Sequence, residues 1–500
     1  MKNITMQDIL ELLKKHDLIS EYSKKIDLSK CKVENISYNS SEVEKNTLFI
    51  CKGINFKSEY LESALEKKAC GYVSQIKYIT SFKDVPYIKV KDIRKALSII
   101  SEYFYDYAYK SFNLIGITGT KGKTTTTNYL KNILDEFEKS KTAYISTMHI
   151  YTGTTDKDNH ITTPESLDLQ KYFYETKMNN INYLTMEVSS QAYKVDRVYG
   201  IKFNIGVFLN ISEDHISPIE HPSFEDYLNC KLQLLKNSNI VVLNNDSKYI
   251  DSMLDASKEA QKVVTFGTNN NSDYYISSIA NEPQGYSFIV KSDKYIYEKE
   301  FVTKILGRFN IENALAAIVV AKILNIDDDS IYNGIAKTEV LGRMTTIKKD
   351  NVTVIIDYAH NKLSFEKLFE TIALDYKNNN IYIVFGCPGN KAYTRRKDLG
   401  TIAAKYCDKI YLTADDPQNE KVHDICSDVS TYIEMQNGNY EIIEDRKQAV
   451  KMAIEKAINV KKNCVVILAG KGSEITQKVN GKLEDYEGDI YLAKKYLLNE

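Results

Sequence analysis

The residues from Gly116 to Thr125 read Gly-Ile-Thr-Gly-Thr-Lys-Gly-Lys-Thr-Thr and are of the types that bind phosphate groups. Glycines let backbone N–H groups converge on phosphate oxygens, and the N-terminus of a following helix adds positive potential. In such a loop Lys123 would reach the terminal phosphates of a nucleotide, and the Thr124 hydroxyl would bind Mg²⁺. The predicted contacts are Gly119, Thr120, Lys121, Gly122, Lys123, Thr124 and Thr125.

The spacing of this loop departs from the common G-x-x-x-x-G-K-[ST] pattern, because Ile117 stands where the first glycine should be. The alternative is a glycine-rich turn with a solvated lysine. An apolar run precedes the loop, however, and a helical pattern follows it, which favours a nucleotide-binding loop. The apolar face of that helix is expected to be Leu130, Ile133, Leu134 and Phe137.

A second lysine is predicted to lie on the buried face of a helix. Between residues 224 and 235, Lys231 takes the one polar place in an otherwise apolar stripe of Phe224, Tyr227, Leu228, Leu234 and Leu235. Burial lowers the pKa of a lysine and leaves its amine able to react with CO₂. The alternative is a lysine whose ammonium reaches back to solvent.

Two further residues follow apolar runs at places where chemistry is expected. Glu187 lies at the end of an expected strand, where an unpaired buried carboxylate would be costly and a Mg²⁺ ion would balance its charge. His215, after the next strand, is the matching second ligand. Each residue alone could equally be a buried ion pair or a core histidine, but the nearby phosphate loop favours a metal site.

These residues require a fold that brings the ends of parallel strands together. Two series of apolar runs, each typical of parallel strands covered on both faces, predict two doubly wound sheets. Ligands of such sheets bind at the carboxyl ends of the strands. The first series is Asn113–Ile117, Tyr183–Val188, Ile205–Leu209 and Ile240–Leu243, and the second is Val352–Ile356, Ile381–Phe385, Ile410–Leu412 and Val465–Leu468.

The length of 500 residues is too great for one ordinary core, and the expected fold class is α/β with three domains. Before the first series, short strands at Thr47–Cys51, Gly71–Ser74 and Tyr87–Val90 alternate with helical stretches at Leu61–Lys68 and Ile93–Phe104. The expected domains are therefore residues 1–110, 111–341 and 342–500.

The composition is that of a globular protein and excludes several classes of partner. The 66 basic and 67 acidic residues nearly balance, so charge gives no case for nucleic acid or a membrane surface. Apolar runs such as Cys464–Ala469 are too short to span a bilayer, and the polar N-terminus shows no signal peptide. The eight cysteines are scattered, with no close Cys/His cluster, so we expect reduced thiols in a cytoplasmic protein and no zinc. We also expect a monomer.

Further motifs follow the phosphate loop in order, and together they resemble the Mur ligases. The loop itself is also similar to that of folylpolyglutamate synthetases. The resemblance implies a domain that binds a UDP-linked substrate, then a central ATPase domain with a parallel sheet, then a Rossmann-like domain. The motifs are Thr162–Glu165, Met186–Ser190, Asn210–His215, Gly307–Asn313, Gly342–Met344, Asp357–Asn361 and Gly470–Glu474.

The resemblance implies a reaction and a role for each matching residue. ATP would phosphorylate the D-glutamate γ-carboxylate of UDP-N-acetylmuramoyl-L-alanyl-D-glutamate, and an amino acid would attack the acyl phosphate, in peptidoglycan synthesis. Catalytic residues would be Lys123, Glu187, His215 and Lys231, with Lys231 as N6-carboxylysine and with Thr124, Glu187, His215 and Lys231 as Mg²⁺ ligands. ATP would also contact Asn313, Arg343 and Asp357, and the UDP-muramoyl-dipeptide would contact Ser40, Thr162, Thr163, Ser189 and Arg197.

The acceptor pocket implied by the resemblance favours L-lysine. Where the diaminopimelate-adding branch carries Asp-Asn-Pro-Arg, this chain reads Asp415-Asp416-Pro417-Gln418, so a second substrate carboxylate would lack its arginine. Gln418 leaves meso-diaminopimelate, ornithine or another diamino acid as alternatives, and a folylpolyglutamate-synthetase-like ligase, a natural-product ligase or a non-catalytic nucleotide-binding scaffold are rival functions. The pocket residues would be Arg396, Asp415, Asp416, Pro417, Gln418, Gly470 and Glu474.

Overall fold

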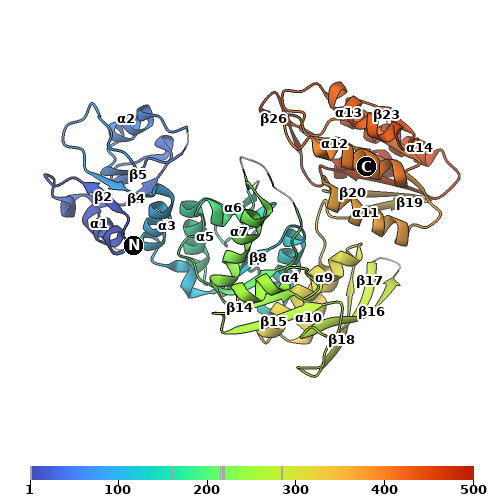
Figure 1. The fold of residues 1–500 in the computed structure, drawn as a ribbon, viewed down its shortest axis with the longest axis horizontal. Coiled ribbons are helices and arrows are strands. Elements are labelled where there is room, and N and C mark those ends of the chain that lie inside the picture. The colour runs from blue at the N-terminus through green and yellow to red at the C-terminus, as the bar shows by residue number, and fades with distance from the viewer. Residues whose placement is uncertain (1–2, 54, 160, 214–215, 217–219, 283–284) are drawn as a thin grey trace. The chain divides into compact units, whose positions relative to one another are not determined.

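The computed structural model describes residues 3–53, 55–159, 161–213, 216, 220–282 and 285–500. The chain forms two compact units (Figure 1). The first comprises Met1–Ser277, Val290–Glu298 and Asn313–Gly334, and the second comprises Ser278–Ile289, Lys299–Glu312 and Ile335–Glu500. The predicted boundaries of three domains, at residues 110 and 341, stay predictions.

The first hundred residues form a five-stranded sheet between two apolar layers. Four strands are parallel and β2 is antiparallel to β7. Three helices accompany the sheet, α1 (Met6–Lys15), α2 (Ser58–Glu66) and α3 (Ile93–Phe104). The strand order is β2 (Ile19–Tyr22), β7 (Tyr87–Val90), β6 (Gly71–Ser74), β5 (Thr47–Ile50) and β4 (Asn35–Ser37).

An eleven-stranded sheet follows, and its central strands are the first predicted series. The strands from β9 to β16 are parallel along the sheet. The order is β11 (Asp156–Asp158), β10 (His149–Tyr151), β9 (Ala143–Ile145), β12 (Tyr183–Glu187), β8 (Asn113–Thr118), β13 (Phe203–Phe208), β14 (Ser238–Asn244), β15 (Lys262–Gly267), β16 (Tyr274–Glu282), β17 (Gly285–Ser292) and β18 (Tyr297–Thr303).

The helices of this region are α4 (Lys123–Glu138), α5 (Ser166–Met178), α6 (Ser190–Lys194), α7 (Phe224–Lys236), α8 (Ile250–Ala256), α9 (Arg308–Ile323) and α10 (Asp328–Lys337). Helix α4 begins at Lys123, so the last three residues of the predicted phosphate loop form its first turn. Its Ile133 and Leu134 are fully buried as predicted, but Phe137 is 37% exposed. Phe137 lies in the last turn of the helix, where its ring contacts the ring of Tyr183 rather than the core.

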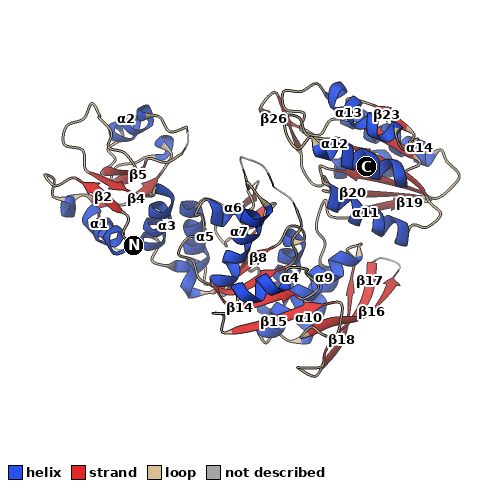
Figure 2. Cartoon of the chain, in the orientation of Figure 1, coloured by secondary structure: helices blue, strands red, loops and turns tan. Residues whose placement is uncertain are grey.

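The second predicted series forms a six-stranded sheet that is parallel except for β19. Helices cover both faces (Figure 2). Val354, Val384 and Val466 pack with α14 on one face, whereas the Phe385 ring contacts Phe365 of α11 on the other. The order is β19 (Thr345–Lys349), β20 (Val352–Asp357), β24 (Cys464–Ala469), β21 (Asn380–Phe385), β22 (Lys409–Leu412) and β23 (Tyr440–Ile442), with α11 (Lys362–Asp375), α12 (Thr394–Tyr406), α13 (Val422–Glu434), α14 (Arg446–Ile458) and α15 (Asp489–Ala493).

The predicted α/β class is therefore confirmed, since apolar runs became parallel strands in both series. All eight cysteines are free thiols. Among the described helices, none combines the length and apolar character needed to cross a membrane.

Candidate active site

The predicted phosphate loop joins β8 to α4 and takes a backbone conformation that requires glycine. Gly122 caps α4 with φ of 87°, and a Cβ there would lie 2.2 Å from the Asn313 Oδ1 atom. Only glycine therefore fits between the loop and Asn313. The Lys123 ammonium donates hydrogen bonds to the carbonyls of Gly119, at 2.8 Å, and Thr120, at 3.2 Å. The loop thus holds its own cation above the turn, together with the start of a helix.

Lys231 faces inward, as its helical spacing predicted. It is 2% exposed, and its Nζ donates to the Gly119 carbonyl at 2.8 Å, the same oxygen that accepts from Lys123. Tyr227, one turn earlier on α7, places its ring 4.9 Å from this Nζ and its hydroxyl 3.1 Å from the Thr120 hydroxyl. Lys123 and Lys231 thus converge on one backbone oxygen of the loop, beside the N-terminus of α4.

Glu187 lies at the same edge of the sheet as the phosphate loop. Strand β12 pairs with β8 so that Glu187 is the register partner of Ile117, and its side chain is fully buried. Its carboxylate accepts hydrogen bonds from the backbone N–H and the hydroxyl of Thr147, both at 3.0 Å. Both groups are neutral, so a divalent cation here would find a negative charge to balance. His215, the other predicted ligand, lies outside the described residues.

Thr147 was missed from the sequence because it lies 40 residues before Glu187. It also connects this carboxylate to the predicted substrate residues, because its hydroxyl is 3.0 Å from that of Thr162. Thr124, predicted as a further metal ligand, lies buried in the first turn of α4. The arrangement fits a Mg²⁺ ion in the types of its oxygen donors.

Three of the predicted substrate residues lie together. The Thr163 hydroxyl donates to the Glu187 carbonyl at 3.0 Å and accepts from the Ser189 backbone N–H at 3.0 Å. Ser189 is the N-cap of α6, and the Arg197 guanidinium donates to the Thr163 carbonyl at 3.0 Å. Arg197 also forms an ion pair at 2.8 Å with Glu165.

Glu165 is held by a second cation that the sequence did not single out. Lys52, two residues after the end of β5, pairs with it, and its ammonium lies 4.4 Å from the centre of the Tyr38 ring. Burial alone would raise the pKa of Glu165, but Lys52 and Arg197 together lower it below its usual value. Ser40, the fifth predicted substrate residue, lies in a short 3₁₀ turn (Ser40–Glu42), where its carbonyl accepts a hydrogen bond from Lys67 at 2.8 Å.

In the second unit, four predicted acceptor residues gather around a buried lysine. Lys471 is 1% exposed, and its Nζ lies 2.9 Å from Asp416 Oδ1, 2.7 Å from Glu474 Oε2 and 4.0 Å from Asp415 Oδ1. Gly470 has φ of 105°, and a Cβ there would lie 2.3 Å from Asp415 Oδ2. Lys471 stands inside a quoted motif, yet its spacing alone did not indicate an internal ion pair.

Burial raises the pKa of Asp415 to about 6, although Lys471 and Arg446 act to lower it. Arg446 is itself buried and pairs with Asp489 at 2.7 Å, and it donates to the Ala469 carbonyl at 2.8 Å. That contact holds the end of β24 directly before Gly470.

Arg396 does not join this cluster through its hydrogen bonds. Its two terminal nitrogens pair with Asp428 and Glu420, each at 2.6 Å, and its side chain is buried. Pro417 packs its carbonyl against Gly389, where a Cβ would lie 1.8 Å away. Gln418 takes a left-handed conformation with φ of 54°.

Arg343 and Asp357, predicted to contact ATP, lie beside the acceptor cluster. The Asp357 carboxylate accepts from the backbone N–H of Met344 at 2.8 Å, and the Arg343 guanidinium lies 4.6 Å from the centre of the Tyr358 ring. The Tyr358 hydroxyl in turn donates to Glu474 at 3.0 Å. One ring thus connects the predicted ATP residues of this unit to the predicted acceptor residues.

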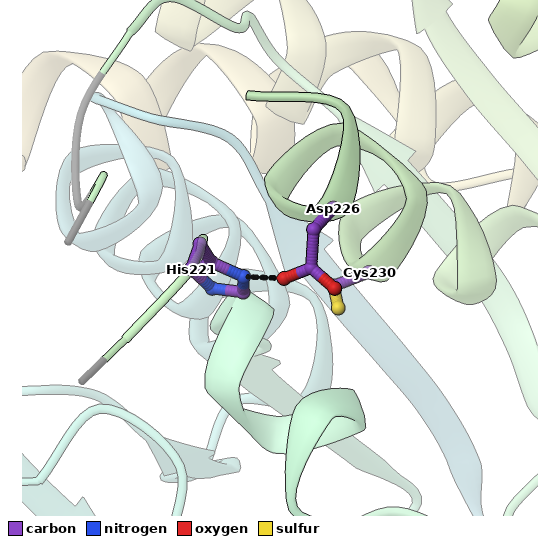
Figure 3. Close-up of side chains that lie close together, drawn as sticks. All are labelled: His221, Asp226 and Cys230. Atoms are coloured by element: carbon purple, nitrogen blue, oxygen red, sulfur yellow. Dashed lines mark hydrogen bonds and ion pairs between the residues drawn. The ribbon is translucent and has the colours of Figure 1, made fainter. Parts of the chain in front are cut away.

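A histidine cluster that the sequence did not reveal lies beside Lys231. The fully buried His221 forms a hydrogen bond with Asp226 at 2.6 Å, and Cys230 lies nearby (Figure 3). The other ring nitrogen of His221 lies 2.9 Å from the Ser190 hydroxyl. From the sequence we expected no close Cys/His cluster. His221 and Cys230, nine positions apart, nevertheless come together because α7 begins between them.

Comparison with known proteins places the chain among described families. Residues 117–321 match the Mur ligase middle domain, and residues 342–472 match the Mur ligase glutamate ligase domain. The chain is 37% identical to the UDP-N-acetylmuramoyl-L-alanyl-D-glutamate--L-lysine ligase of Enterococcus faecalis, over 99% of each chain. It is 38% identical to the enzyme of the same name in Streptococcus thermophilus, over 99% of this chain and 100% of that one.

A solved structure extends the likeness to the fold. A UDP-N-acetylmuramoyl-L-alanyl-D-glutamate--2,6-diaminopimelate ligase matches with a TM-score of 0.68 and 23% identity, covering 100% of this chain and 99% of that one. At this identity the match concerns the fold alone.

Proposed function

The chain belongs to the Mur ligase family, and from that premise we propose that it is an ATP-dependent ligase that adds L-lysine to UDP-N-acetylmuramoyl-L-alanyl-D-glutamate in peptidoglycan synthesis. Relatives named for this reaction match it over nearly its whole length. The structural observation that carries the proposal is the pair of lysines, Lys123 and Lys231, that converge on the Gly119 carbonyl of the phosphate loop.

The reaction has two balanced steps. A γ-carboxylate oxygen of D-glutamate attacks the terminal phosphorus of ATP, and ADP leaves with the bridging oxygen. The uncharged α-amine of lysine then attacks the acyl carbon, phosphate leaves with the C–O bonding pair, and the nitrogen loses a proton. Both steps increase negative charge on phosphate oxygens, so Lys123 and the helix N-terminus of α4 would stabilise them.

The residues around the loop fit a bound Mg²⁺. Thr124, Glu187 and a carboxylated Lys231 would hold it, with His215 as a further ligand, and the ion would supply positive charge to the phosphate oxygens. Lys231 suits carboxylation because its amine is buried and lies against the phosphate loop, on the same carbonyl as Lys123. Asn313 beside Gly122 would meet the nucleotide base, while Arg343 and Asp357 would contact the phosphates and ribose.

The acceptor cluster supports lysine as the third amino acid. Three carboxylates, Asp415, Asp416 and Glu474, face one ammonium, Lys471, so three negative charges less one positive leave a formal surplus of two. A distal ammonium would meet this surplus favourably, whereas a distal carboxylate would meet like charge. Gln418 offers no cation to receive that carboxylate, which places meso-diaminopimelate behind lysine and ornithine.

The remaining assignments follow from the same reaction. Thr162, Thr163, Ser189 and Arg197, together with Ser40, would hold the UDP-muramoyl-dipeptide. Residues 1–110 would form its UDP-binding domain, residues 111–341 the ATP-binding domain and residues 342–500 the acceptor domain. ATP as substrate implies a cytoplasmic enzyme, and we expect a monomer.

The proposal is tested by phosphate release from purified enzyme with ATP, Mg²⁺, UDP-N-acetylmuramoyl-L-alanyl-D-glutamate and a panel of amino acids. We expect release with L-lysine, weaker release with ornithine, and a product whose mass has gained one lysine residue. Lys123→Ala is the negative control. Release with glutamate and a folate instead would indicate a folylpolyglutamate-synthetase-like ligase, and no substrate-dependent release would indicate a binding scaffold.

A further inference from the structure

His221 has no place in the proposed reaction, yet it is one of the most constrained polar side chains beside the phosphate loop. It is fully buried, and both ring nitrogens have partners. Nδ1 lies 2.6 Å from Asp226 on α7 (Figure 3). Nε2 lies 2.9 Å from the Ser190 hydroxyl at the start of α6. Through these two contacts His221 bridges the start of α7 and the start of α6.

One end of this bridge reaches the predicted substrate residues. Ser190 directly follows Ser189, the N-cap of α6. The Ser189 backbone N–H donates to the Thr163 hydroxyl, which donates to the Glu187 carbonyl. The position of Ser190 is therefore coupled to the strand end that carries the predicted Mg²⁺ ligand Glu187.

The other end reaches Lys231. The His221 ring packs edge-on against Tyr227, with ring centres 5.2 Å apart. Tyr227 contacts the Thr120 hydroxyl and carries the Lys231 ammonium over its ring. A shift of α7 relative to α6 would thus move Lys231 relative to both the loop and Glu187.

The cluster is better described as a structural bridge than as a metal site, although one ligand atom from each of His221, Asp226 and Cys230 lies within 4.8 Å of the others. The Lys194 ammonium already pairs with Asp226 at 2.7 Å, and Ser190 occupies the second ring nitrogen. Burial raises the pKa of the Cys230 thiol, which disfavours the thiolate that a metal would need. A metal here would have to displace both contacts.

We propose that His221 is a positioning residue that holds α7 against α6, so that Lys231 lies at the depth where its amine is carboxylated and faces the metal. This inference rests on the proposed function. Because a misplacement of about 1 Å can cost roughly 100-fold in rate, loss of the bridge lowers turnover without removing any group that touches substrate. The carbamate loses its fixed surroundings, so Lys231 requires more dissolved CO₂ to remain loaded.

The test compares His221→Ala, His221→Gln and His221→Asn in steady-state assays at a series of bicarbonate concentrations. For His221→Ala we expect kcat to fall by roughly 100-fold at ambient CO₂ and partial recovery at high bicarbonate. The KM for ATP should stay unchanged, because the backbone of the phosphate loop is retained. Gln can accept from Ser190 and Asn can donate to Asp226, so each should restore part of kcat. Ser190→Ala removes one arm alone and should give a smaller loss of the same kind.

Two control variants separate positioning from general stability. Met253 is fully buried in the same apolar cluster as Tyr227, so Met253→Ala should lower Tm with no change in bicarbonate dependence. His423 pairs with Glu444 at 3.5 Å on the surface of the second unit. His423→Ala should therefore leave both Tm and the bicarbonate dependence of kcat unchanged. If His221→Ala resembled Met253→Ala, with lower Tm and wild-type bicarbonate dependence, the inference would be overturned.

Lys231→Ala distinguishes the failure of the inference from the failure of the proposed function. Full activity in Lys231→Ala would overturn the proposed role of a carboxylated Lys231. An inactive Lys231→Ala together with wild-type kcat in His221→Ala would overturn only the bridge. If His221→Ala fails to fold, the variants His221→Gln, His221→Asn and Ser190→Ala still test the inference. A positioning role predicts intermediate turnover and a raised bicarbonate dependence in all three.

Discussion

The phosphate-loop site and the acceptor cluster each contain a buried lysine, but among the described residues the partners of the two lysines differ in charge. Each places a buried lysine beside a glycine that follows a parallel strand, Lys231 at Gly119 and Lys471 at Gly470. The lysine at the loop donates to a neutral carbonyl that already accepts from Lys123, whereas Lys471 is enclosed by three carboxylates.

This difference shows that the groups around a buried lysine, and not its burial alone, indicate which kind of ligand the site favours. At the loop, two lysines converge on one carbonyl at the N-terminus of a helix, an arrangement that suits phosphate groups. In the acceptor cluster, three carboxylates face the single ammonium of Lys471, and the remaining negative charge attracts a second ammonium from the substrate. Variants that remove or invert the local charge of one region therefore test the comparison directly.

The largest effect is expected at Lys231. Lys231→Ala removes the group proposed to carry a negative metal ligand, and loss of several kcal/mol of charge stabilisation corresponds to roughly 1,000-fold or more in kcat. Added short carboxylic acids should partly restore turnover by supplying a negative oxygen in the space left. Lys231→Arg, which keeps a cation but cannot form a carbamate, should be equally inactive, and an active Arg variant would contradict the carbamate.

Lys123→Ala is expected to lower kcat by about 100-fold or more, because it removes a cation from developing phosphate charge. Lys123 is half-buried and donates to two carbonyls of its own loop, which water can satisfy in the variant, so Tm should change little. Thermal unfolding and phosphate release on the same preparation provide the measurement. A large fall in Tm would mean that Lys123 supports the fold rather than the reaction.

How far these regions could be predicted from the sequence depended on the range of the interactions. The parallel strands and the inward face of Lys231 follow from patterns within a few residues, and the structure confirms both. The prediction that Phe137 lies on the buried face of α4 was wrong, because Phe137 lies in the last turn, where the helix leaves the core. Local periodicity describes which side of an element is buried but not where the neighbouring element ends.

Contacts across long sequence separations could not be predicted. Thr147 meets Glu187 across 40 residues, and His221 meets Ser190 across 31. Lys471 reaches Asp416 across 55 residues, and nothing in the sequence indicated that ion pair. No spacing rule specifies such partners, because they depend on which strand ends the sheet brings together.

The charge of the acceptor cluster predicts a selectivity that two substitutions should narrow. An unpaired carboxylate beside Asp415 and Asp416 should cost about 2–5 kcal/mol, which favours lysine over meso-diaminopimelate. Asp416→Asn with Gln418→Arg removes one negative charge and adds a cation, so the ratio of kcat/KM for the two amino acids should fall by roughly 10–100-fold. A wild-type preference for meso-diaminopimelate would refute the charge argument.

The smallest expected effect is a pH dependence carried by Asp415. Burial raises its pKa to about 6 from an ordinary 3.8, so the folded state binds a proton more tightly than the unfolded state. The contribution of this group to the free energy of unfolding is therefore fully present below about pH 4 and is lost as pH rises towards 6, by about 3 kcal/mol in all.

Acceptor binding should respond in the opposite sense, since the ionised carboxylate that attracts an ammonium appears as pH rises through about 6. The kcat/KM for L-lysine should thus increase a few-fold across this range, while the KM for ATP, bound at the cationic loop, should show no such step. Asp415→Asn should remove both the rise of kcat/KM with pH and the fall of the free energy of unfolding over the same pH range. An unchanged pH profile in that variant would assign the step to another group and leave the contrast between the two lysine sites resting on Asp416 and Glu474.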